Sequence, residues 1–152
     1  MKTEFFKHNE HSFLAKVWVP AHKRTVFLQL PESTTEFVDV PDIVFYLFYE
    51  PDVYFGYVIQ QMYVFTIVDG KEHAPLSLPN GHCVCFGSMF RRGTTAKSAI
   101  ENCIDAYWST EFEYSFNSGS NSNRFKHPIS LDPEFMESLA AHYKPVVQTQ
   151  TN

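Results

Sequence analysis

Two apolar and aromatic runs in the middle of the chain restrict its fold more than any other feature. They span Ile43 to Tyr49 and Val53 to Ile59, and they mix β-branched with aromatic side chains, which favour strands. Neither run alternates cleanly with polar residues. We therefore expect both faces of these strands to be covered, one by helices and the other by a partner or by the chain termini. The hairpin turn between the runs is expected at Glu50-Pro51-Asp52.

Further short strands extend this pair. Apolar segments typical of strands lie at Phe13 to Val19, Thr25 to Leu30 and Tyr63 to Val68. Asp69-Gly70 is a strong turn signal directly after the last of them. The middle of the chain is therefore expected to form an antiparallel meander.

Two helices are expected in the second half of the chain. Ala96 to Trp108 places apolar residues on one helical stripe, and Thr94 or Thr95 is suited to cap its start. Asp132 and Pro133 open a second helix over about 132–144, and the tail 145–152 is expected to be frayed. The predicted fold class is α+β, an antiparallel meander packed by one or two C-terminal helices.

The length and composition fit a single domain over 1–152. The chain has 152 residues, of which 44% are apolar and 19% charged, so one core is the expectation. No window approaches the roughly 18 apolar residues of a membrane span, and the first residues lack the layout of a secretory signal. We therefore expect a cytoplasmic protein with no membrane partner.

Charge is distributed unevenly along the chain. The net charge is −5, and no Lys or Arg lies between Arg24 and Lys71, an interval that holds seven Asp and Glu residues. A protein that reads nucleic acid needs a basic face, so a nucleic-acid partner is disfavoured. The acidic interval either faces a basic protein partner or only keeps strand ends and turns soluble.

The cysteines indicate a reducing compartment. There are three, Cys83, Cys85 and Cys103, and an odd number without a signal sequence argues against a disulfide framework. Two of them lie in the irregular stretch Leu76 to Ser88, between the expected sheet and helix, where functional groups often collect.

Three interpretations of this stretch remain open. As metal ligands, His82, Cys83 and Cys85 lack the second cysteine pair that a structural zinc site needs, so no metal is expected. As structural residues, the two cysteines pack as small apolar side chains on a short buried strand. As a nucleophile, one cysteine is exposed, Arg91 or Arg92 favours its thiolate, and Asn80 stabilises an oxyanion.

Several short motifs carry a family resemblance over about 37–119, roughly half of the chain. In chain order they are Pro41 to Phe45, Met62 to Thr66, Ala74-Pro75-Leu76, Leu78-Pro79-Asn80, Val84 to Gly87, and Trp108 to Phe112. Together they resemble the C-terminal part of PRTRC system protein B and related prokaryotic proteins with the ubiquitin-conjugating-enzyme fold. Where that family has a histidine before Pro-Asn, this chain has Leu78.

The resemblance implies a function and a site. Cys85 matches the cysteine that carries a ubiquitin-like modifier as a thioester, and Asn80 matches the asparagine that stabilises the oxyanion. His82, Asp105 or Glu111 would orient or deprotonate the acceptor amine. No cofactor is implied, and the partners are a modifier and its activating enzyme. The alternative is a non-catalytic protein-interaction or assembly module, in which the aromatic strands form an interface.

Overall fold

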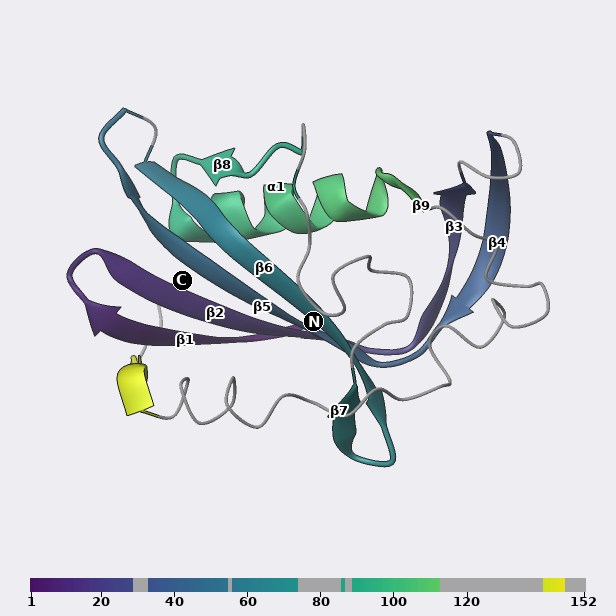
Figure 1. Ribbon diagram of the computed structural model, residues 1–152, viewed down its shortest axis with the longest axis horizontal. Coiled ribbons are helices and arrows are strands. Elements are labelled where there is room, and N and C mark those ends of the chain that lie inside the picture. Colours follow the sequence, from purple (N-terminus) through teal and green to yellow (C-terminus); the bar gives the residue numbers. More distant parts are fainter. Residues whose placement is uncertain (29–32, 55, 74–85, 87–88, 113–140, 147–152) are drawn as a thin grey trace.

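The computed structural model describes residues 1–28, 33–54, 56–73, 86, 89–112 and 141–146 (Figure 1). Within these residues one helix, α1, spans Ala96–Trp108. The strands are β1 (Lys2–Asn9), β2 (Ser12–Val19), β3 (His22–Leu28), β4 (Thr34–Val40), β5 (Ile43–Asp52), β6 (Gly56–Val68), β7 (Lys71–His73), β8 (Arg92–Gly93), β9 (Glu111–Phe112) and β10 (Lys144–Pro145). The coarse α+β prediction is confirmed, because the described residues are mostly antiparallel sheet with α1 packed against it.

Most of the strands in the described part of the chain belong to one 7-stranded sheet. Its order is β10-β1-β2-β5-β6-β7, and β8 pairs with β6 beside this path. All of these pairs are antiparallel, so the meander predicted for the middle of the chain is present. The β3–β4 hairpin leaves this sheet and forms a separate 3-stranded sheet with β9, at the end of α1 opposite β8 (Figure 1).

The turn between β5 and β6 lies later than the sequence indicates. Strand β5 continues through Glu50, Pro51 and Asp52, so the turn predicted there is wrong. The chain reverses just before Gly56, whose φ of +85° suits glycine. A Cβ at Gly56 would lie 2.4 Å from the Thr94 carbonyl oxygen, so close packing also requires glycine at this position.

Strand β6 runs unbroken where two strands were expected. Residues 56–59 of the predicted strand Val53 to Ile59 and all of the predicted strand Tyr63 to Val68 belong to one strand, Gly56–Val68, whereas Val53 and Tyr54 form the turn before it. The turn at Asp69-Gly70 is confirmed, with φ of 51° and 76° at these two residues. Positive φ at both central residues is what a tight two-residue hairpin turn of type I′ requires.

Both faces of the run Ile43 to Tyr49 are covered, as predicted, whereas Val53 and Tyr54 at the start of the second run are exposed. Phe45 of β5 is fully buried on the helix side, with its ring centroid 5.5 Å from that of Tyr107. Its neighbour Tyr46 is buried on the opposite face against Phe65, at 5.4 Å. On that second face Tyr143, near the chain end, stacks edge-on against Phe48 at 5.4 Å. Helix α1 and the C-terminal segment therefore cover opposite sides of one sheet.

Helix α1 has the predicted bounds and the predicted cap. Thr95 is the N-cap, and its side chain accepts a hydrogen bond from the Ser98 backbone N–H at 3.0 Å, within a capping box. The apolar stripe faces the sheet, with Ile100, Cys103, Ile104, Tyr107 and Trp108 all buried. Amphipathic spacing and capping chemistry thus agree on where this helix begins and which face it buries.

The second predicted helix, over about 132–144, lies mostly outside the described residues. Residues 141–142 are helical, but Lys144 and Pro145 form the short edge strand β10, so the predicted helix end is wrong. The Val146 backbone N–H donates to the Phe5 carbonyl at 2.8 Å and continues the pairing to β1. Within the described part of the chain, no helix is long and apolar enough to cross a membrane.

Candidate functional site

The predicted site residues Asn80, His82 and Cys85 lie outside the described residues, as does Cys83. The structure instead defines the two points between which this stretch runs. Strand β7 ends at His73 on one side, and Phe86 packs against the helix-side core on the other. The stretch that carries Asn80, His82 and Cys85 therefore connects the edge strand β7 to Phe86, which packs against the core beneath α1.

Arg91 is held next to Phe86. The Ile59 backbone N–H donates to the Arg91 carbonyl at 2.9 Å, and Arg91 Nη1 donates to the Ile59 carbonyl at 3.2 Å. Its guanidinium carbon lies 4.9 Å from the centroid of the Phe86 ring, a cation–π contact. A fixed positive charge thus stacks on the residue that follows Cys85 in the chain.

Arg92, the other cation named from the sequence, has a different role. Its guanidinium forms an ion pair with the Asp52 carboxylate, which is mostly buried. The Arg92 carbonyl accepts a hydrogen bond from Asn102 Nδ2 at 2.9 Å. Arg92 therefore ties the end of β5 to β8 and α1.

Cys103 is a structural residue. Its side chain is fully buried, with Sγ 3.6 Å from Met62 Sδ. Burial raises the pKa of the Cys103 thiol to about 12, although the charge of Arg91 acts in the opposite direction. A thiol that stays protonated at neutral pH is a poor nucleophile, so any cysteine chemistry falls to the other two cysteines.

Several residues of the acidic interval have structural roles. Asp42 Oδ1 accepts a hydrogen bond from the Ala21 backbone N–H at 2.7 Å. Glu50 Oε1 accepts one from Gln60 Nε2 at 2.7 Å, and Asp52 pairs with Arg92. These contacts favour the simpler interpretation of the interval, in which carboxylates fix turns and strand ends.

Asp105 and Glu111 were the other candidates for handling an acceptor amine. Asp105 is exposed near the end of α1 and lines a hollow with Arg24. Glu111 belongs to β9, which pairs in parallel with β3, and its side chain lies outside the description. Asp105 lies in the last turn of α1, and Glu111 lies in β9 directly after it. Figure 1 shows this end of the helix near β3, with β8 at the opposite end.

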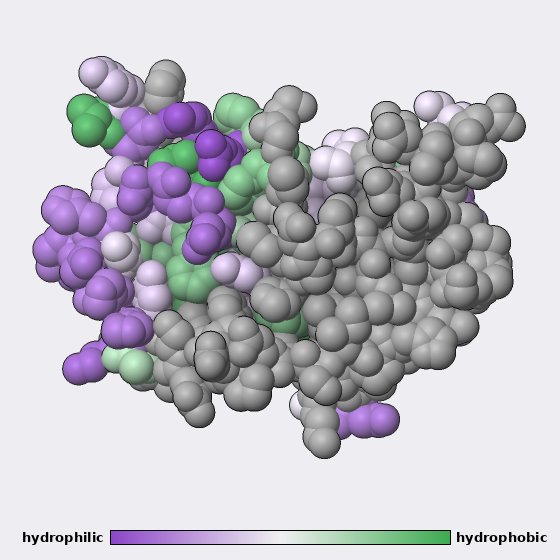
Figure 2. All heavy atoms as spheres, in the orientation of Figure 1, coloured by the Kyte–Doolittle hydropathy of each residue, from purple (hydrophilic) through white to green (hydrophobic). Residues whose placement is uncertain are grey.

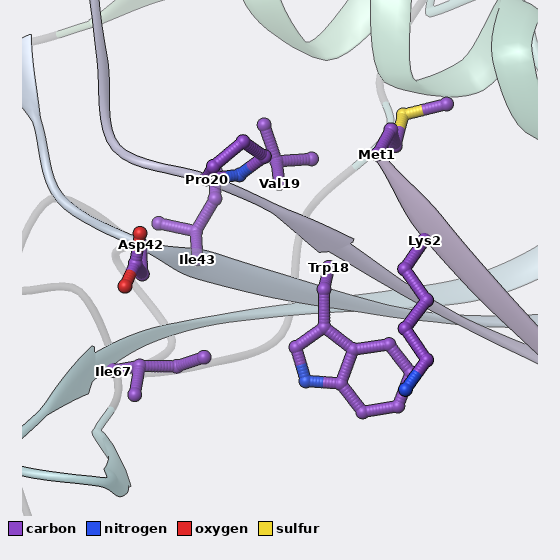
Figure 3. Close-up of a pocket in the computed structure, with 8 residues that line it drawn as sticks. All are labelled: Met1, Lys2, Trp18, Val19, Pro20, Asp42, Ile43 and Ile67. Carbon is purple, nitrogen blue, oxygen red and sulfur yellow. The ribbon is translucent and has the colours of Figure 1, made fainter.

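One hollow of about 370 Å³ lies at the edge of the second sheet face (Figure 3). Its lining residues are Met1, Lys2, Trp18, Val19, Pro20, Asp42, Ile43 and Ile67. The two charged residues already have contacts, because Lys2 Nζ lies 5.2 Å from the Trp18 ring centroid and Asp42 holds Ala21. What remains is a small apolar recess without a directional polar group.

The tip of the β5–β6 hairpin is apolar and exposed. Val53 is 93% exposed and Tyr54 85%, and Phe90, which leads into β8, is 58% exposed. Figure 2 shows apolar atoms projecting at this tip, at the upper left of the molecule. Neighbouring exposed apolar side chains on an ordered hairpin are typical of a contact surface for another protein.

Comparisons with protein-family models, with curated proteins and with solved structures found no match for this chain. The family resemblance of the sequence motifs therefore stays a prediction.

Proposed function

We propose that this chain is a ubiquitin-conjugating-like protein of prokaryotic or phage type that carries a ubiquitin-like modifier as a thioester on Cys85. The observation that carries the proposal is the order of its parts. An antiparallel meander is followed by the Pro79-Asn80 to Cys85 segment and then by a helix packed across the sheet. This is the arrangement that the resemblance implies for the fold of ubiquitin-conjugating enzymes.

The surroundings of Phe86 support a reactive Cys85. Arg91 stacks on Phe86, the next residue along the chain, and a nearby cation favours a thiolate over a thiol. The thiolate is the nucleophilic form of cysteine, and it works best in a reducing compartment such as the cytoplasm. Cys103 does not compete with it, because its thiol is buried.

The chemistry consists of two acyl transfers. The Cys85 thiolate attacks the carbonyl carbon of the modifier's thioester on its activating enzyme, and the activating enzyme's thiolate leaves. An acceptor amine then attacks the Cys85 thioester, an amide bond forms, and the Cys85 thiolate leaves. The Asn80 side-chain amide donates a hydrogen bond to each oxyanion, and His82 takes the proton that the amine releases.

The pH dependence of alkylation tests this function. We expect Cys85 in the native protein to react with an apparent pKa well below the usual value of about 8.5, while Cys103 reacts only after unfolding. Arg91→Gln should raise the apparent pKa of Cys85, and Lys97→Gln, which changes an exposed lysine of α1, should leave it unchanged. Mass spectrometry of each cysteine gives the rates.

A second step tests transfer itself. A short peptide thioester should form an adduct with the wild-type chain and with Cys83→Ala, but not with Cys85→Ala. An ordinary or raised pKa at Cys85, or adducts that survive Cys85→Ala, would contradict the proposed function.

The exposed hairpin tip favours the alternative, a non-catalytic protein-interaction module. In that case Val53 and Tyr54 are the contact residues, and replacing either by serine should change the free energy of unfolding by less than about 0.5 kcal/mol. A photo-crosslinker at position 54 should give discrete adducts in cells, whereas one at the exposed position 101 on α1 should give none. Equal crosslinking at both positions would argue against this function.

A further inference from the structure

A polar hollow of about 440 Å³ lies between β3 and the C-terminal end of α1. Its lining residues are Arg24, Thr25, Asp105, Trp108 and Ser109, and we call it the Arg24 hollow. Its volume falls within the roughly 300–1,000 Å³ of typical small-molecule sites. It lies apart from the Arg91 end of α1, so what it binds is independent of the chemistry proposed for Cys85.

Arg24 stacks on Trp108 but has no acidic partner among the described residues. Its guanidinium carbon lies 4.2 Å from the centroid of the Trp108 ring. Its Nε is buried and makes no hydrogen bond, and among the described residues no carboxylate comes within ion-pairing distance of it. Burial lowers the pKa of Arg24, and the charge of Asp105 acts in the opposite direction. A guanidinium remains charged at neutral pH, so the hollow has a preorganised cation on one wall.

The rest of the Trp108 ring is packed as well. His22 meets it edge-on with ring centroids 5.8 Å apart, and Trp108 is only 8% exposed. The His22 ring is itself held at 2.9 Å from the Pro20 carbonyl oxygen. Because Trp108 is packed on these sides, it gives Arg24 a firm ring to stack on, and this stacking lowers the freedom that the guanidinium loses when a ligand binds.

Asp105 provides the opposite charge. It is exposed, and it forms no ion pair within the described part of the chain, although it is close enough to act on the charge of Arg24. The hydroxyl of Ser109, which also lines the hollow, donates to the Asp105 backbone carbonyl at 3.0 Å and not to the Asp105 carboxylate. The hollow therefore presents a cation and an anion that do not neutralise each other by direct contact.

We propose that the Arg24 hollow binds a free α-amino acid. The guanidinium of Arg24 pairs with the ligand's α-carboxylate, for which its planar fork of donors is suited, and the carboxylate of Asp105 pairs with the α-ammonium group. A phosphate or a simple carboxylate fits less well, because Asp105 and the carbonyl end of α1 both repel an anion. Only a ligand with both charges satisfies both walls.

Trp108 gives a direct readout of binding. The chain has two tryptophans, so Trp18→Phe leaves Trp108 as the sole tryptophan, with Arg24 stacked on its ring, and selective excitation of tryptophan avoids the tyrosines. Titration with glycine at constant ionic strength should produce a saturable change in this emission. Acetate, which has only the carboxylate, and methylammonium, which has only the ammonium, should each bind at least about tenfold more weakly than glycine.

Substitutions of Arg24 and Asp105 test whether these two side chains bind the charged groups of the ligand. Arg24→Gln and Asp105→Asn should each weaken glycine binding at least about tenfold. The matched controls Lys23→Gln and Glu101→Gln remove exposed neighbouring charges that do not line the hollow, and they should bind glycine as before. Circular dichroism confirms that each variant is folded, and if Arg24→Gln is not, the exposed Asp105→Asn still decides the result.

Two results would overturn the proposal. The first is the absence of any saturable glycine response, both in Trp108 emission and in the indole N–H resonance of the wild-type chain. The second is acetate binding as tightly as glycine with Asp105→Asn unaffected, which would indicate a general anion site.

Discussion

At the scale of single residues, the buried thiol of Cys103 makes stability depend on alkaline pH. Its pKa in the folded chain is about 12, above the usual value of about 8.5 for an unfolded cysteine. The unfolded chain therefore releases this proton first, and the stabilisation is lost as the pH rises above the unfolded value. We expect the free energy of unfolding to fall by up to about 1.4 kcal/mol per pH unit between pH 8.5 and 10.

Urea unfolding at several pH values measures this slope, and Cys103→Ala is the comparison. The variant should be less stable at neutral pH, because it loses contacts in a filled core, but its stability should decline less steeply over the same pH interval. Above about pH 10 the buried Tyr49, whose pKa is also raised by burial, adds a second loss in both proteins. Equal slopes for the two proteins below pH 10 would contradict the assignment to Cys103.

At the scale of elements, the start of α1 is decided by one of two adjacent threonines. Thr95 accepts the Ser98 N–H, so Thr95→Ala should lower the free energy of unfolding by about 1 kcal/mol. Thr94 is also exposed but is not the cap, so Thr94→Ala is a matched control and should change stability by less than about 0.5 kcal/mol. Thermal or urea unfolding of both variants measures these changes. Equal losses in the free energy of unfolding would mean that both threonines contribute to the cap.

The elements show what local sequence signals predict and where they stop. The bounds of α1 follow from apolar spacing and a capping residue, both of which are local. The β5–β6 turn could not be placed the same way, because Pro51 and Asp52 resemble turn residues, while the chain reverses before Gly56. What selects Gly56 is the Thr94 carbonyl packed against it, a contact between segments distant in the sequence.

The sites, too, include features that a local sequence pattern can propose and features that it cannot. The motifs near Cys85 are short and consecutive, so a sequence pattern can propose them, and their site stays a prediction because Asn80, His82 and Cys85 lie outside the described residues. The structure adds only that Arg91 contacts Phe86. The pairing of Arg24 with Trp108 could not be predicted. It requires the β3–β4 hairpin to leave the main sheet and reach the far end of α1, and no local pattern in the sequence encodes that departure.

At the scale of the whole molecule, the described residues form two cores on opposite faces of one sheet. Val44 and Tyr46 of β5 belong to the core on one face, while Phe45 and Leu47 belong to the core beneath α1. Strand β5 is also the only route between β2 and β6 in the described sheet order. If either core were lost, alternate residues of β5 would become exposed, and the other core needs the same strand. We therefore expect the two cores to unfold together.

The two tryptophans report on the two cores separately. Trp108 belongs to the core beneath α1, and Trp18 packs against the core on the opposite face. We expect urea unfolding followed through Trp108 in Trp18→Phe, and through Trp18 in Trp108→Phe, to give one transition each. Far-UV circular dichroism of the same variant is the reference, because it follows the sheet that both cores share and takes account of that variant's own stability. In each variant the emission curve should coincide with the dichroism curve. An earlier emission change in Trp108→Phe would mean that the Trp18 face opens first and that the sheet alone does not couple the cores.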